Sequence, residues 1–163
     1  MATEKKVLWK AEEIGARAHA YEQRLNPNST FLGVGLSRMS GLTRAHVTIA
    51  RVPPGKDSFA YHAHLVEEEW VYILSGKGIA EIDGQEHEVG PGDFMGFKAP
   101  SVAHLLKNRG EEELVYLMGG DQAPLDVVEY PALKKRYLLV AGPSGTEFYA
   151  LSEPEKPFGR KGS

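Results

Sequence analysis

The sequence contains no cysteine, which excludes disulfides, thiolate metal sites and cysteine nucleophiles. A chain without disulfides suits a reducing compartment, and we expect the protein to be cytoplasmic. Long apolar runs are also missing. The charged start, Met1-Ala2-Thr3-Glu4-Lys5-Lys6, leads into no apolar stretch. We therefore predict neither a signal peptide nor a transmembrane segment, and no membrane partner.

A strong excess of charge of either sign is absent as well, because the formal net charge is -3. The sequence has no basic patch and no segment typical of a helix-turn-helix, so we expect no nucleic-acid partner. Charged residues make up 25% and hydrophobic residues 42%, as in an ordinary globular protein. A length of 163 residues predicts one domain that can bury a substantial core.

Short strand-like segments dominate the chain, and turns rich in Gly, Pro and Asp separate them. Their aromatic and β-branched content is typical of β-strands. The predicted strands cover residues 31–36, 45–52, 70–74, 79–83, 86–89, 94–97, a strand at His104, and 114–118, with further pieces at 126–130, 137–140 and 148–151. This pattern predicts an all-β barrel or sandwich.

The chain divides into three parts by composition. Residues 1–30 are mostly polar, and apolar spacing from Ala11 to Leu25 predicts a short helix or an extended segment there. Residues 31–120 form the predicted barrel core. Residues 121–163 hold the C-terminal strands, and 153–163 are predicted to be an extended tail.

Four potential metal ligands lie between the predicted strands: His62, His64, Glu69 and His104. His62 and His64 are two positions apart, so on a strand both side chains point to one face. Glu69 opens the strand-like run 70–74 after a connection long enough for a turn. We therefore expect two adjacent antiparallel strands to present His62, His64 and Glu69 to one cavity.

Three imidazoles and one carboxylate suit one divalent transition metal ion: Fe, Mn, Ni, Cu or Zn. A structural zinc site is disfavoured because the sequence has no thiolate. Four ligands on one side of an octahedron leave two positions open for O₂, water or a chelating molecule. A single histidine on a strand more often bonds to backbone or water, so the hypothesis depends on all four residues acting together.

These residues resemble the two sequence motifs of the cupin superfamily. The first motif is matched by Gly55, His62, His64, Glu69 and Gly76, with one extra residue after Gly55. The second is matched by Gly90-Pro91-Gly92-Asp93, then His104 and Asn108. In the second motif the expected Pro-x-Gly is replaced by Ala99-Pro100-Ser101, while the His-x-x-x-Asn spacing is kept. Asn108 and the glycines are interpreted as structural.

The resemblance implies a double-stranded β-helix, the jelly-roll barrel of the cupins. It also implies a metal-dependent enzyme on a small oxygen-rich molecule, of the dioxygenase, decarboxylase or isomerase type. The alternative is a non-catalytic module that contains a metal and binds or senses a small molecule. Glu67 and Glu68, beside Glu69, are candidates for an acid or base, although we interpret them as solvated turn residues.

Alternation along the strand at residues 70–74 predicts an exposed apolar face. If Glu69 points into the barrel, Val71 and Ile73 do too, while Trp70, Tyr72 and Leu74 face outward. Large apolar groups there need a cover, which is the N-terminal segment, the C-terminal strands or a second subunit. Because cupins often pair, the resemblance implies a homodimer.

Overall fold

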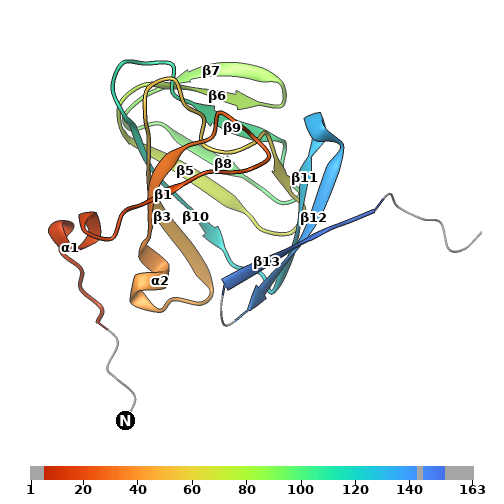
Figure 1. The fold of residues 1–163 in the computed structure, drawn as a ribbon, viewed down its shortest axis with the longest axis horizontal. Helices are drawn as coiled ribbons and strands as arrows, with labels where there is room; N and C mark the ends of the chain where they lie inside the picture. Colours follow the sequence, from red (N-terminus) through yellow and green to blue (C-terminus); the bar gives the residue numbers. More distant parts are fainter. Residues whose placement is uncertain (1–5, 143–144, 153–163) are drawn as a thin grey trace, which may run out of the picture.

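Three antiparallel β-sheets build the molecule in this computed structural model, which describes residues 6–142 and 145–152 (Figure 1). The largest sheet has six strands in the order β1 (His19–Tyr21), β2 (Phe31–Gly35), β3 (Ala45–Val52), β10 (Leu114–Asp121), β5 (Glu69–Ser75) and β8 (Phe94–Phe97). The apolar sides of the sheets enclose one main core. This architecture is the all-β jelly-roll fold expected from the sequence.

Two smaller sheets complete the barrel. One has the order β7 (Gln85–Val89), β6 (Gly78–Ile82) and β9 (His104–Lys107). The other has the order β13 (Gly145–Ala150), β12 (Lys135–Gly142), β11 (Leu125–Tyr130) and β4 (Ala63–His64). An antiparallel bridge between His62 and His104 connects these two sheets at their edges.

The predicted N-terminal helix is much shorter than its apolar spacing suggested. Helix α1 spans Ala11–Gly15 and does not reach Leu25. Residues 19–21 instead form β1, which pairs with β2, and the ring of Tyr21 stacks on Phe31 at a centroid distance of 5.3 Å. Pairing with the sheet therefore outweighs the local helical pattern. A second helix, α2 (Leu36–Ser40), and the 3₁₀ turn η1 (Pro131–Leu133) were not predicted.

The two α-helices described have five residues each, well short of the length that a bilayer crossing requires. The cytoplasmic location remains a prediction. So does the division at residues 30 and 120, although β11 of the third part pairs directly with β4 of the second. The tail at 153–163 lies outside the described residues.

The predicted alternation along β5 is confirmed. Val71 and Ile73 are buried in the core, whereas Tyr72 and Leu74 are exposed on the outer face. Trp70, predicted on the same outer face, is half-buried. On β3 the inward face carries Ala50 and Val52, and His46 lies on the same face near the rim of the barrel. His46 Nδ1 is 3.2 Å from the Asp121 carbonyl oxygen, so this rim histidine has a backbone partner.

Asn108 is fully buried and connects the end of β3 to the turn that follows β9. Its amide nitrogen donates to the carbonyl oxygens of Val52 and Glu112, at 2.7 Å and 2.8 Å. Its amide oxygen accepts the N–H of Gly110 at 2.9 Å. Each contact satisfies a backbone group, so Asn108 has a structural role, as interpreted from the sequence.

We predict that Asn108→Ala lowers the free energy of unfolding by about 3 kcal/mol, because three backbone groups lose a buried partner. Urea unfolding of the metal-free protein measures the change. Asn28→Ala is the control, since Asn28 makes one exposed side-chain bond to the Gly55 carbonyl, and it should cost less than about 1 kcal/mol. Equal losses in the two variants would contradict the structural role of Asn108.

Candidate metal centre

The backbone places two of the histidines side by side at the junction of the smaller sheets. The N–H of His104 donates to the His62 carbonyl at 2.8 Å, and the N–H of His62 donates to the His104 carbonyl at 3.2 Å. Residues that exchange both bonds in an antiparallel pair have side chains on one side. The two imidazoles accordingly lie with ring centroids 4.7 Å apart.

His64 is held by the segment in which this chain departs from the cupin pattern. Ser101 Oγ accepts the N–H of His64 at 2.8 Å, and the N–H of Ser101 donates to the His64 carbonyl at 2.8 Å. A glycine at this position would lack the hydroxyl that makes the first of these bonds. The Ala-Pro-Ser variant therefore supplies an additional contact to the predicted ligand.

The expectation that β4 and β5 are adjacent strands is wrong. Strand β4 pairs with β11, and β5 lies between β10 and β8 in the six-stranded sheet. Residues 65–68 cross from one sheet to another instead of making a hairpin. Glu69 therefore reaches the three histidines from a different sheet, across the interior of the barrel.

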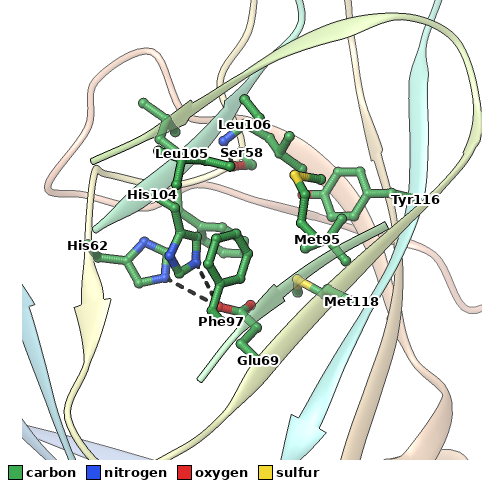
Figure 2. Close-up of a pocket in the computed structure, with 14 residues that line it drawn as sticks. Ser58, His62, Glu69, Met95, Phe97, His104, Leu105, Leu106, Tyr116 and Met118 are labelled. Atoms are coloured by element: carbon green, nitrogen blue, oxygen red, sulfur yellow. Dashed lines mark hydrogen bonds and ion pairs between the residues drawn. The ribbon is translucent and has the colours of Figure 1, made fainter. Parts of the chain in front are cut away.

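The structure brings His62, Glu69 and His104 together as one potential ligand group, and it places His64 beside Glu69 in a second group with Glu67 and Asp126. Glu69 Oε2 lies 2.9 Å from Nε2 of His104, 3.7 Å from Nε2 of His64 and 3.9 Å from Nε2 of His62. Figure 2 shows His62 and His104 converging on Glu69. The four side chains expose only 8% to 15% of their surface. Three nitrogens thus surround one carboxylate oxygen, largely out of solvent.

Each imidazole is anchored through its other nitrogen. Nδ1 of His62 donates to the Ala60 carbonyl at 2.8 Å, and Nδ1 of His104 donates to the Val102 carbonyl at 3.1 Å. Carbonyl oxygens only accept, so Nδ1 carries the hydrogen and a neutral ring keeps its lone pair at Nε2. For His64, Nδ1 is 2.6 Å from a carboxylate oxygen of Asp126, with the same consequence.

The charges favour a cation at this point. Burial, reinforced by His104, lowers the pKa of His62 to about 4, so its ring is neutral. Burial alone would raise the pKa of Glu69, but the hydrogen bond with His104 and the neighbouring imidazoles lower it to about 2. Burial also opposes charging of His64, yet the carboxylates of Asp126 and Glu69 raise its pKa above the ordinary value.

Donor chemistry tests whether these residues fit a metal ion. Inward lone pairs on neutral imidazoles and an ionised carboxylate attract a cation to the point where they meet. The hydrogen bond between His104 Nε2 and Glu69 Oε2, 2.9 Å long, would have to give way to a bound metal ion. Three imidazole nitrogens and one carboxylate oxygen are ligands that divalent transition metals accept. The residues therefore fit such an ion.

Space on the two sides of this centre is very unequal. On the inner side lies an apolar chamber with a volume of only about 20 Å³. That is room for roughly one water molecule. On the outer side, an adjoining cleft has a volume of about 370 Å³. A further cleft of about 230 Å³, whose lining includes His62, His64 and Glu69, also adjoins the centre. A ligand larger than water or O₂ therefore has two routes of approach, and neither leads through the inner chamber.

Four aromatic or sulfur-containing side chains from strands β8 and β10 line the inner chamber (Figure 2). They are Met95, Phe97, Tyr116 and Met118. Tyr72 instead faces outward, and the Tyr61 hydroxyl accepts the N–H of Gly84 on the outer strands.

The sequence misjudged Glu67 and missed Asp126, two acidic residues that line the outer cleft. Glu67 is half-buried and accepts the N–H of Ala123 at 2.8 Å, so it is not a solvated turn residue. Burial raises the pKa of Glu67. Glu68 is exposed, as interpreted. Asp126 was missed, because it follows His64 by 62 positions and no local motif connects them.

We predict that His62→Ala lowers the affinity for Co²⁺ or Zn²⁺ by more than about 100-fold, because it removes a direct donor to the metal. Even the loss of a residue that only hydrogen-bonds to a metal ligand lowers metal affinity about 10–100-fold. Metal analysis after dialysis and competition with a chelator measure the loss. His87→Ala is the control, because His87 is exposed on β7. Unchanged metal content in His62→Ala would exclude this site.

Known proteins with related sequences and structures share this fold. The family model of the cupin domain matches residues 48–120. A crystal structure of a putative sugar phosphate isomerase from Acidithiobacillus ferrooxidans is 34% identical, covers 96% of this chain and 98% of its own, and superposes with a TM-score of 0.84. A sugar phosphate isomerase of the cupin superfamily from Silicibacter pomeroyi is 26% identical, with 82% and 85% of the two chains covered and a TM-score of 0.71.

A third relative is an uncharacterised protein of Methanocaldococcus jannaschii, 35% identical over 68 residues. The match covers 42% of this chain and 53% of the relative, so it spans about half of that protein's length. The family match includes both motifs, and the 34% identical structure shares the fold over nearly the whole chain. The chain therefore belongs to the cupin superfamily, as a small cupin domain.

Proposed function

We propose that this cupin is a metal-dependent enzyme of the isomerase type, acting on a small oxygen-rich molecule such as a sugar phosphate. Cupins commonly bind a metal, and this chain has a matching group of histidine and glutamate side chains. The observation that carries the proposal is the convergence of the four proposed donors beside an open cleft that is also lined by Glu67, a carboxylate outside the proposed ligand set. The proposed ligands are His62, His64, Glu69 and His104.

The isomerase type is favoured over the dioxygenase and decarboxylase types by two observations. Two relatives, 34% and 26% identical, are named as sugar phosphate isomerases. Glu67 also lines the outer cleft with His64 and Glu69, where a substrate bound at the centre would lie. Isomerisation of a hydroxy-carbonyl compound needs a base at this place and no oxidant.

A divalent ion would polarise the substrate carbonyl oxygen and so acidify the neighbouring C–H. The Glu67 carboxylate would remove the proton from the hydroxyl-bearing carbon and return it to the former carbonyl carbon. A proton moves between the two oxygens at the same time, so the atoms balance without a co-reactant. The N–H of Ala123 orients Glu67 by its hydrogen bond.

The far end of the cleft offers a partner for a phosphate group. A wider adjoining cleft shares His46, Gln122 and Thr146 with the one beside the metal centre, and Arg38 lines it. Arg38 is the only lysine or arginine among the described residues that line these two clefts. Guanidinium groups suit phosphate recognition, whereas Glu67 and Glu68 would repel a phosphate closer to the metal.

We expect the metal-loaded protein to interconvert an aldose phosphate and its ketose, and to exchange the transferred hydrogen with deuterium in D₂O. NMR over a panel of sugar phosphates measures both. Glu67→Gln should lower kcat by at least about 100-fold, as for loss of a general base, with metal content unchanged. Glu68→Gln is the matched control, since Glu68 is the exposed neighbour.

Other outcomes would replace the isomerase assignment. Oxygen consumption with small acids, diketones or phenols would favour a dioxygenase, and release of CO₂ would favour a decarboxylase. Metal binding with no turnover of any compound would favour the non-catalytic binding or sensing module. Metal analysis of the purified protein would distinguish Fe, Mn, Ni, Cu and Zn.

We also propose that the protein is a homodimer through the outer face of β5 and β8. Tyr72 and Phe94 are partners in register there and are 40% and 64% exposed, beside Leu74 at 40%. Three covers were considered for this face. Those exposures show that neither the described N-terminal segment nor the described C-terminal strands cover it, which leaves a second copy.

Light scattering is expected to give a dimeric mass for the wild type. Phe94→Glu places a charge in the proposed interface and should shift the mass to that of a monomer. Leu133→Glu is the control, because Leu133 is 41% exposed in η1, away from β5 and β8. A monomeric wild type at working concentration, or an unchanged mass for Phe94→Glu, would contradict the proposed interface.

A further inference from the structure

Asp126 is a buried carboxylate on β11 that reaches the proposed metal centre from the C-terminal sheet, with 2% of its surface exposed. Its Oδ2 is 2.6 Å from Nδ1 of His64. Its Oδ1 accepts the N–H of Val66 at 2.9 Å and the N–H of Glu67 at 3.4 Å. We propose that Asp126 is a positioning residue that sets the tautomer of His64 and thereby makes it a metal donor.

This inference rests on the proposed metal role of His64 and deepens it. His62 and His104 bond through Nδ1 to carbonyl oxygens two positions earlier, so their tautomers are set within their own segments. His64 depends on a residue 62 positions later. Among the three imidazoles, His64 is the one whose donor nitrogen depends on how the C-terminal sheet is placed.

The two oxygens of Asp126 have different partners, and this difference determines the effect of Asp126→Asn on His64. The N–H groups of Val66 and Glu67 can only donate, so whatever occupies the Oδ1 position must accept. In Asp126→Asn the amide oxygen must therefore take that position. The amide NH₂ is then left facing Nδ1 of His64, the position that Oδ2 held.

An NH₂ group donates, so Nδ1 of His64 would have to accept and give up its hydrogen. A neutral imidazole would then carry its hydrogen on Nε2, the nitrogen 3.7 Å from Glu69 Oε2. A protonated Nε2 has no lone pair for a metal ion. A substitution that conserves size and hydrogen-bonding capacity would thus convert His64 from a donor into a blocked ligand.

The experiment compares Asp126→Asn with Asp126→Ala in the full-length chain. Alanine leaves Nδ1 free to keep its hydrogen with a water molecule, so it imposes no tautomer. We expect Co²⁺ affinity to fall about 10–100-fold in Asp126→Asn and to fall less in Asp126→Ala, although the alanine variant should be the less stable of the two in urea. A purely structural role predicts the opposite order of affinities.

Histidine ¹⁵N NMR of the metal-free protein provides a readout that does not depend on metal binding. His64 should change from the Nδ1–H to the Nε2–H form in Asp126→Asn, while His62 and His104 keep theirs. Asp121→Asn is the matched control, because Asp121 accepts the N–H of Glu68 at 2.8 Å in the same connection and is exposed. In Asp121→Asn, neither the affinity for Co²⁺ nor the tautomers of the three histidines should change.

The outcomes separate this inference from the proposed function. A tautomer change with no metal binding in the wild type would support the role of Asp126 in setting the tautomer and reject the metal centre. Metal binding without isomerase activity leaves the inference supported by the order of affinities and rejects only the isomerase. An unchanged His64 tautomer in Asp126→Asn would overturn the inference.

Discussion

The convergence of His62, His64 and His104 on Glu69 is the constraint on which this site depends. The Nε2 atoms of the three histidines lie within 3.9 Å of one carboxylate oxygen of Glu69, and little solvent reaches them. Polar atoms gathered out of solvent in this way favour a proton or a metal cation between them. The fold holds this arrangement because each imidazole is fixed from behind by an oxygen that only accepts.

The surrounding architecture explains how these side chains are held in position. The smaller sheets are connected through the His62–His104 bridge, so two donors are set by backbone hydrogen bonds and not by flexible side chains. Glu69 arrives from the six-stranded sheet, whose inner face is buried in the core. A metal ion at this point would therefore connect separate sheets and should stabilise the barrel as a whole.

The C-terminal sheet would connect the proposed metal centre to the choice of substrate. Strand β11 supplies Asp126 behind His64, and strands β12 and β13 supply walls of the outer cleft. The inner chamber admits only a water-sized molecule, so the chemistry of larger ligands is decided on the side that this sheet forms. One fold serves many functions. The substrate of this cupin would therefore depend more on these cleft walls and on Glu67 than on the proposed metal ligands.

The sequence by itself determined the strand pattern and the alternation along β5, and it supplied the four candidate donor residues, because periodicity and residue type are local properties. It did not show that β4 and β5 lie in different sheets, that Ser101 and Asp126 hold His64, or that residues 19–21 join a sheet. Those features were decided by the tertiary structure. Strand partners are selected by hydrogen bonds and burial between residues far apart in the chain, and no local pattern encodes which distant segment will provide them.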